Sequence, residues 1–251
     1  MPASGALLFL LVGAVPLQDG AAVDSAVRKF KSDYYRAGVR EEDRVVAVGA
    51  LAAHRCGKVA RVLAPYLTKS PVSVRIVTAR HLAGFSGIEG VEENLLSALL
   101  HYRNNGQRGV QVTVLQALGT LRASCAAEAV SRLVESPDIW VAKAAIEAAG
   151  KIRSASSVDS LVRALVRLDG PCGDKDAFLD PFEGELPATG LLQIALREAA
   201  LKDRKRRISQ RAVLREPMRA ALKYITKLDF SGVKEWQEWW RAHKRNYVVP
   251  P

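Results

Sequence analysis

The sequence predicts an all-α protein, an α-solenoid (superhelix) built from stacked helical pairs. The main observation is an alanine- and leucine-rich segment that recurs four times, at residues 45–54, 76–85, 112–121 and 143–152. Aligned on Leu51, Leu82, Leu118 and Ala149, the copies stand 31, 36 and 31 residues apart. A recurring period of this length indicates repeats whose apolar faces are covered only by neighbouring repeats. Composition agrees, because 49% hydrophobic residues with only 6% aromatics suit a core of Ala, Val and Leu.

A second amphipathic stretch follows each recurring segment, at residues 58–67, 91–102, 126–135 and 158–168. Its apolar residues stand three and four apart, as in Leu161, Leu165 and Leu168. This spacing is typical of a helix with one buried face. Each repeat is therefore predicted to be a helical pair.

Small residues and helix-start signals mark the pairs. The column after the aligned leucines holds Ala52, Ala83, Gly119 and Gly150, where we expect helices to touch. Ser70-Pro71 and Ser136-Pro137-Asp138 precede first helices, and we expect serine to cap the first amides and proline to occupy the first turn.

The pattern resembles HEAT-like repeats, in which a first helix has a valine-arginine pair near its start and a shorter second helix follows. Val74-Arg75 fits, and Arg44 occupies the matching column of the first repeat. Gln111 and Ala142 stand in that column later, so the arginine ladder common in the family is incomplete. The resemblance covers residues 41–168. It implies a scaffold, a transport factor, a DNA glycosylase or a bilin lyase, so the fold alone does not select the function.

The amino-terminal residues predict export. Residues 6–15 form an apolar run, and small residues offer signal-peptide cleavage after Ala14 or Ala22. No Lys or Arg precedes the run, and the alternative is an apolar cap on the first repeat. The run is too short to span a membrane, and no transmembrane segment is expected in the mature chain.

The chain divides into five predicted parts. These are a signal peptide at 1–22, HEAT-like repeats at 23–169, an acidic loop at 170–190, a final basic helical region at 191–229, and a cap helix and tail at 230–251. The loop carries the carboxylates Asp174, Asp176, Asp180, Glu183 and Glu185. It lacks the glycine and glutamate spacing of a calcium loop, so we expect an acidic connector and no metal.

Positive charge is concentrated in two places. The formal net charge is +11, and cleavage after Ala22 would raise it to +12 because only Asp19 is lost. A flanking electrostatic site is predicted at Arg204, Lys205, Arg206 and Arg207. A basic row on the second helices, along the concave face, gives the candidate partner contacts Lys58, Arg61, Arg132, Arg163 and Arg167. A positive patch attracts an acidic protein, an acidic polymer or nucleic acid, and the alternative is a solvated helix face.

Two of these arginines are also predicted to be paired. Glu128 precedes Arg132 by four residues, and Asp159 precedes Arg163 by the same interval. Such spacing favours surface ion pairs, which would leave less charge for a ligand.

The carboxyl-terminal helix is predicted to close the array. Phe230, Trp236, Trp239 and Trp240 form its structural cap, with the tryptophans at helical spacing. The stretch is similar to the aromatic terminal helix of many bacterial HEAT-repeat proteins. The alternative is a platform that stacks bases or sugars, but terminal repeats need a cap.

The sequence contains no Gly-x-Ser-x-Gly, phosphate-binding glycine loop or His-Glu-x-x-His. Cys56 and Cys125 lie two repeats apart, about 20 Å at usual helix spacing, which is beyond disulfide reach. A bridge from Cys125 to Cys172 stays open, and the odd count leaves one thiol unpaired within the chain.

We therefore expect a non-catalytic, exported HEAT-like scaffold that binds a protein partner through its concave face and basic carboxyl-terminal region. No cofactor and no metal are expected, and the oligomeric state is not predicted. The alternatives are a nucleic-acid-binding protein resembling base-repair glycosylases and, more remotely, a bilin lyase.

Overall fold

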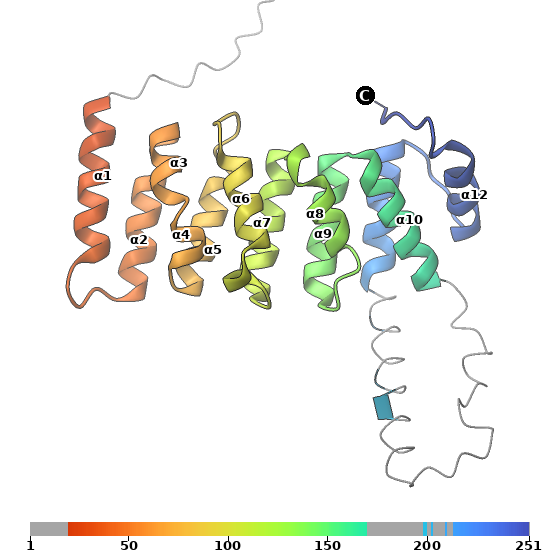
Figure 1. The fold of residues 1–251 in the computed structure, drawn as a ribbon, viewed down its shortest axis with the longest axis horizontal. Helices are drawn as coiled ribbons and strands as arrows, with labels where there is room; N and C mark the ends of the chain where they lie inside the picture. The colour runs from red at the N-terminus through yellow and green to blue at the C-terminus, as the bar shows by residue number, and fades with distance from the viewer. Residues whose placement is uncertain (1–19, 170–197, 200–201, 203–208, 210–212, 251) are drawn as a thin grey trace, which may run out of the picture.

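The structure is a computed structural model that describes residues 20–169, 198–199, 202, 209 and 213–250. Within these residues every regular element is a helix and no strand occurs. The helices stand side by side in one elongated row (Figure 1). The prediction of an all-α solenoid is confirmed.

The recurring segments form the first layer of helices. These are α2 (Glu41–Ala52), α5 (Val72–Leu82), α7 (Arg108–Leu121) and α9 (Ile139–Ile152), and each packs against the next. A further helix at residues 213–226 continues the layer, since Gly150 of α9 faces Ala221. Each of the four helices begins four residues before the segment that predicted it, because the recurring alanine- and leucine-rich pattern does not include the first helical turn.

The second layer consists of the shorter partner helices. They are α3 (Gly57–Leu63), α4 (Tyr66–Lys69), α6 (Val91–Leu100), α8 (Ala127–Leu133) and α10 (Ala155–Asp169), with 3₁₀ turns at η1 (Tyr102–Asn104) and η2 (Ser124–Ala126). The prediction of one helix over 58–67 is wrong. Pro65 has no amide hydrogen to donate to Arg61, so the helix stops at Leu63 and restarts at Tyr66.

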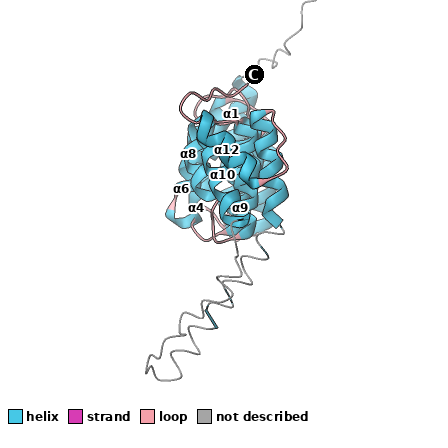
Figure 2. Cartoon of the chain, turned by 90° about the vertical axis from the view of Figure 1, so that its right-hand side faces the viewer, coloured by secondary structure: helices cyan, strands magenta, loops and turns pink. Residues whose placement is uncertain are grey.

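A helix covers each end of the row. α1 (Gly20–Tyr35) packs on α2 and buries Val23, Val27, Phe30 and Tyr34. At the other end α12 (Val233–His243) packs against α10, as the end-on view in Figure 2 also shows. Repeat arrays need such covers because the last repeat has no neighbour to bury its apolar face.

The helix starts differ from the capping prediction. The N-cap of α9 is Asp138, whose carboxylate accepts from the amides of Trp140 and Val141, whereas Ser136 accepts from the amide of Asp138. The N-cap of α5 is Pro71, without a side-chain cap, and the hydroxyl of Ser70 is hydrogen-bonded to Tyr34. The two serines therefore do not cap these helices, because the Ser136 hydroxyl accepts from the N-cap residue Asp138 and the Ser70 hydroxyl is bonded to Tyr34.

Candidate partner-binding groove

The predicted basic row lies on the second layer, where most of its charges are already paired. Lys58 and Arg61 belong to α3, Arg132 to α8, and Arg163 and Arg167 to α10, and all five side chains are exposed. The ion pairs are Lys58 with Asp24, Arg132 with Glu128 at 2.6 Å, Arg163 with Asp159 at 3.0 Å and Arg167 with Glu135 at 2.9 Å. The two pairs expected from four-residue spacing are present. Of the row, Arg61 makes no ion pair with any described residue, and its Nε donates to the carbonyl of Gly57 at 3.3 Å.

The structure thus brings Arg132, Arg163 and Arg167 together on adjacent helices and leaves Lys58 and Arg61 at the far end. Paired, exposed charges contribute little to stability and attract a polyanion weakly. The predicted site at Arg204, Lys205, Arg206 and Arg207 lies outside the described residues, as does the acidic loop.

The tryptophans of the cap are largely used in packing. Trp236 is 1% exposed and Trp240 is 7% exposed. The indole Nε1 of Trp240 donates to Asp159 at 2.8 Å, and that of Trp236 donates to the Phe230 carbonyl at 3.2 Å. Trp239 is partly buried and lies between Trp236 and Tyr247. Two of the three indole rings are therefore not accessible for stacking on a base or a sugar.

A groove of about 870 Å³ lies on the first layer, where α7, α9 and the helix at 213–226 meet. Its floor consists of small residues, Gly119, Gly150, Ala220 and Ala221. A Cβ on Gly119 would stand 2.9 Å from the Cα of Ala148, and one on Gly150 would stand 3.2 Å from the Cβ of Ala221. The small residues permit this close helix approach, which makes the floor shallow and apolar.

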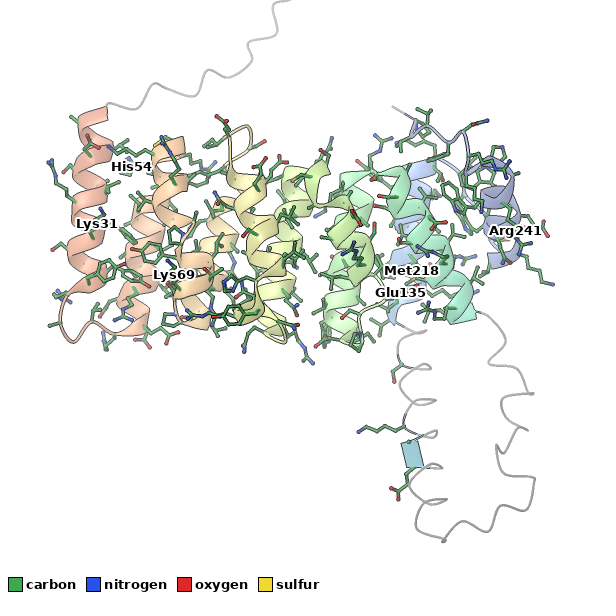
Figure 3. The ribbon with its side chains drawn as sticks, in the orientation of Figure 1. Lys31, His54, Lys69, Glu135, Met218 and Arg241 are labelled. Atoms are coloured by element: carbon green, nitrogen blue, oxygen red, sulfur yellow. The ribbon has the colours of Figure 1, made fainter. Side chains whose placement is uncertain are left out.

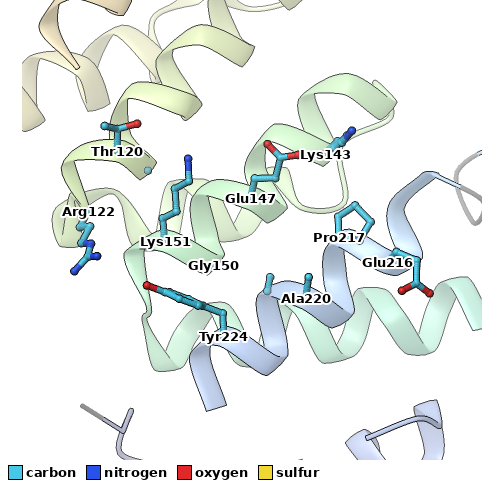
Figure 4. Close-up of a pocket in the computed structure, with 12 residues that line it drawn as sticks. Thr120, Arg122, Lys143, Glu147, Gly150, Lys151, Glu216, Pro217, Ala220 and Tyr224 are labelled. Carbon is cyan, nitrogen blue, oxygen red and sulfur yellow. The ribbon is translucent and has the colours of Figure 1, made fainter. Parts of the chain in front are cut away.

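Charged side chains surround this floor. Arg122, Lys143, Glu147 and Lys151 line the groove, and none of them forms an ion pair with a described residue. Figure 4 shows Glu147 and Lys151 rising from α9, opposite the helix that carries Pro217 and Ala220. Four of the five cations of the basic row are paired within the chain, whereas the groove presents unpaired charges of both signs to solvent.

Arg122, one of these cations, follows the last residue of α7. Arg122 adopts a left-handed backbone conformation with φ of 55°, and Arg153 does the same after α9 with φ of 57°. In both cases the residue ends the helix at a position where glycine is more usual. The reversal of the chain at Arg122 brings its side chain to the mouth of the groove.

Tyr224 forms one wall of the groove and is 46% exposed. The guanidinium of Arg153 lies 5.6 Å from its ring centroid and the ammonium of Lys227 lies 5.1 Å from it. These cations restrict the ring without covering it. Exposed, held tyrosines of this kind are enriched among the residues that dominate protein–protein binding energy.

The residues that line the groove have the composition of a binding surface. An apolar floor with a polar, charged rim is the usual anatomy of a protein–protein interface. No His, Cys or Ser is among the described residues that line it, so these residues provide no nucleophile with an adjacent imidazole base. Two carboxylates, Glu147 and Glu216, lie beside its cations, which disfavours the phosphate backbone of a nucleic acid as its ligand.

Other sites are not found in the described part of the chain. It holds no group of three or more His, Cys, Asp or Glu side chains placed to bind a metal. Cys56 and Cys125 are both free thiols, and Cys172 lies outside the described residues. None of the described helices is long and apolar enough to cross a membrane.

Paired helices stacked in two layers, with each end covered, define an α-solenoid. Residues 92–170, which include almost all of α6 and continue through α10, match the family model described as HEAT repeats. This part of the chain therefore consists of HEAT-like repeats, and the helical pairs on either side of it continue the same stack. No curated protein and no solved structure matches it significantly. HEAT repeats commonly serve as protein-interaction scaffolds.

Several residues that form the groove have a recognisable pattern in the sequence, although they are not part of the predicted basic rows. Gly119 and Gly150 were recognised as contact positions, but not as the floor of a binding surface. Lys143, Glu147 and Lys151 follow one another at four-residue intervals on the helix face opposite the apolar stripe. Tyr224 could not be assigned, because its position beside α9 depends on how the chain returns after residue 169.

Proposed function

We propose that the protein is a non-catalytic scaffold that binds a protein partner in the groove formed by α7, α9 and residues 213–226. The observation that carries the proposal is the contrast between the two layers. Four of the five basic-row side chains, Lys58, Arg132, Arg163 and Arg167, are paired within the chain, whereas the groove combines unpaired charges of both signs with an apolar floor and an exposed tyrosine.

The occupant that fits is a peptide segment or helix with small apolar side chains and charges of both signs. Its apolar side chains would lie over Gly119, Gly150 and Ala220. Its acidic groups would meet Arg122, Lys143 and Lys151, and a basic group would meet Glu147. Complementary charges of this kind fix the register of a partner and speed its association.

The first experiment is site-specific photo-crosslinking in the native host. A photoreactive phenylalanine replaces Tyr224 in the groove or, as the control, Arg132 on the second layer. The proposal expects one protein to be crosslinked from position 224 and not from position 132. Equal crosslinking from both positions, or from neither, contradicts it.

The partner identified in this way then allows a quantitative test. Exchanging Glu147 and Lys151 (Glu147→Lys with Lys151→Glu) inverts the charge order in the groove and keeps composition and net charge. The matched exchange on α8 is Glu128→Arg with Arg132→Glu. The groove exchange should weaken the dissociation constant by about tenfold or more and the α8 exchange should leave it unchanged. The reverse result, or binding of duplex DNA that alone responds to the groove exchange, would overturn the proposal.

Export is part of the proposal, and it rests on the apolar run at residues 6–15. Cleavage after Ala14 leaves α1 whole, and cleavage after Ala22 removes from α1 only Gly20, Ala21 and Ala22, which are exposed. Both sites therefore spare the buried face of α1 that begins at Val23. Mass spectrometry of fractionated host cells should find a chain beginning near Val15 or Val23 in the envelope or medium. An intact Met1 in the cytoplasm would contradict export and make nucleic acid the first ligand to test.

A further inference from the structure

The amino-terminal end of the array contains a second cavity, of about 440 Å³, between α1, α2 and the α3–α4 segment. Tyr34, Tyr35 and Tyr66 line it. The rings of Tyr34 and Tyr66 meet edge to face with centroids 4.6 Å apart. The hydroxyl groups of Tyr35 and Tyr66 lie 3.0 Å apart, and that of Tyr34 lies 2.8 Å from the Ser70 hydroxyl.

The phenol of Tyr66 is a neutral hydrogen-bonding group at physiological pH. Burial raises the pKa of Tyr66 above its ordinary value, and the hydrogen bond and charge of Tyr35 act in the same direction. A neutral phenol can donate a hydrogen bond to an anion without adding negative charge of its own. The tyrosines therefore provide apolar ring edges and polar hydroxyl groups in one cavity.

Four cations line the same cavity, namely Lys31, Arg44, Arg61 and Lys69. None of the described lining residues is acidic, and none of the four cations forms an ion pair with a described residue. Figure 3 shows Lys31 on α1 and Lys69 on α4 at the same end of the array. Two nearby cations outside the cavity are paired, Arg40 with Asp43 and Lys58 with Asp24. A cluster of like charges with no counter-charge creates a strong local attraction for anions.

Arg44 is the most informative of these cations because the array contains its structural equivalent. In the next repeat Arg75 donates to the carbonyl of Arg103 at 2.9 Å and to the side-chain oxygen of Asn104 at 2.7 Å. The corresponding loop of the first repeat carries Lys69, Ser70 and Pro71, and the Ser70 hydroxyl is hydrogen-bonded to Tyr34 and not to Arg44. The side chain of Arg44 makes no hydrogen bond with a described residue, and its guanidinium lies 5.4 Å from the ring centroid of Tyr34. Its Nε is buried without a partner, as is that of Arg75.

We infer that this cavity is a binding site for an aryl phosphate or aryl sulfate group, whose oxyanion takes the place that Asn104 and the Arg103 carbonyl occupy around Arg75. A planar guanidinium is suited to bidentate hydrogen bonds with such an oxyanion. Lys31, Arg61 and Lys69 supply further positive charge, and the tyrosine rings contact the aryl group. The site lies at the opposite end of the array from the groove and does not depend on the proposed function.

Calorimetric titration of the full chain tests this inference with phenyl phosphate, phenyl sulfate, inorganic phosphate and phenol as probes. We expect an aryl oxyanion to bind, inorganic phosphate to bind more weakly and phenol not to bind. Equal affinity for inorganic phosphate and phenyl phosphate would exclude a role for the aryl group and assign the site to free phosphate. Absence of binding by every anion would overturn the inference.

Two variants localise the binding. Arg44→Met with Lys69→Met should weaken the binding of the aryl oxyanion by at least about tenfold, since two charge-assisted contacts are lost. Arg61→Met with Lys69→Met changes only exposed side chains, so it keeps the test valid if the first variant is unstable. The control Arg132→Met with Lys234→Met removes the same two charges elsewhere. Equal weakening in the control would show attraction to net charge alone and would contradict a defined site.

Discussion

Small side chains bring the first helices into near contact in the carboxyl-terminal half of the array, whereas tyrosine rings fill the space between helices at its amino-terminal end. Gly119 and Gly150 are the contact points of α7 with α9 and of α9 with the helix at 213–226. Tyr34 and Tyr66 occupy the corresponding space between α1 and α4. The close approach leaves a shallow open groove, and the wider spacing leaves a cavity. The size of the side chains packed between the helices thus determines the shape of the candidate site at each end of the array.

The arginine column shows the same difference within one structural position. Arg75 connects two repeats through Asn104, which is fully buried and also donates to the carbonyls of Leu67 and Ala98. Arg44 occupies the equivalent place, but its side chain contacts the Tyr34 ring and makes no hydrogen bond with a described residue. One residue type in one column therefore stabilises the array in the second repeat and is available for a ligand in the first.

The largest loss of stability is expected from a change in the cap helix α12. Trp236→Ala should destabilise the protein by about 3–5 kcal/mol, because it empties the space of a fully buried ring. Hydrogen exchange should show α10 and α12 opening while α1 and α2 keep their protection. The control is Trp140→Ala, at a position 53% exposed, which should cost less than about 1 kcal/mol. Similar costs for the two variants would refute the role of α12 as a cap.

The next largest loss of stability is expected when a large side chain is placed at the contact between α7 and α9. Gly119→Leu should cost about 2–3 kcal/mol, because the new side chain meets the backbone of Ala148 at a distance that forces α7 and α9 apart. Urea denaturation followed by circular dichroism measures the loss. Gln116→Leu on the exposed face of α7 is the matched control and should change stability by less than about 0.5 kcal/mol. A tolerated leucine at position 119 would show that the two helices are not held by close contact.

Substitutions of the two equivalent arginines, Arg75 and Arg44, should differ in their cost to stability. Arg75→Met should cost about 2 kcal/mol, because it leaves the buried oxygen of Asn104 without its donor. Arg44→Met should cost at most about 1 kcal/mol, since only the contact with the Tyr34 ring is lost. Denaturation midpoints of the two variants, measured side by side, check the difference. If Arg44→Met is the more damaging change, Arg44 is a structural residue.

Asp138, the N-cap residue of α9, should make a smaller contribution to folding stability, and this contribution should depend on pH. Burial raises the pKa of Asp138, but its hydrogen bonds with Arg108 and with the amides of Trp140 and Val141 outweigh burial and hold the pKa below its ordinary value. A lowered folded-state pKa contributes stability above the unfolded-state pKa, and this contribution is lost as the pH falls through the folded-state value.

Asp138→Ala should therefore cost about 1 kcal/mol at neutral pH, and the difference from wild type should shrink as the pH falls below about 4. Glu238→Ala, an exposed carboxylate change on α12, should give a small difference that does not vary with pH. Urea titrations at several pH values measure both variants. A cost for Asp138→Ala that does not fall as the pH is lowered below the unfolded-state value of about 3.9 would mean that the carboxylate is not the stabilising group.

The repeat period and the apolar stripes alone determined the fold class, the two helical layers and the fold of the carboxyl-terminal cap helix. These features depend on local spacing, because a helix exposes the same face every three to four residues wherever it lies in the chain. The four-residue spacing also predicted the pairs of Arg132 and Arg163, which are local to one helix.

The two candidate sites were decided only by the tertiary structure. The groove needs Tyr224 beside Lys151, and the cavity needs Arg44 beside Tyr34 and Lys69. These residues come from different helices, and their distances depend on how closely the helices pack. The sequence shows which residues are charged, but whether a charge is neutralised by a neighbouring repeat depends on contacts across the array. Arg44 and Arg75 look alike in sequence, and only their surroundings separate a structural arginine from one available to a ligand.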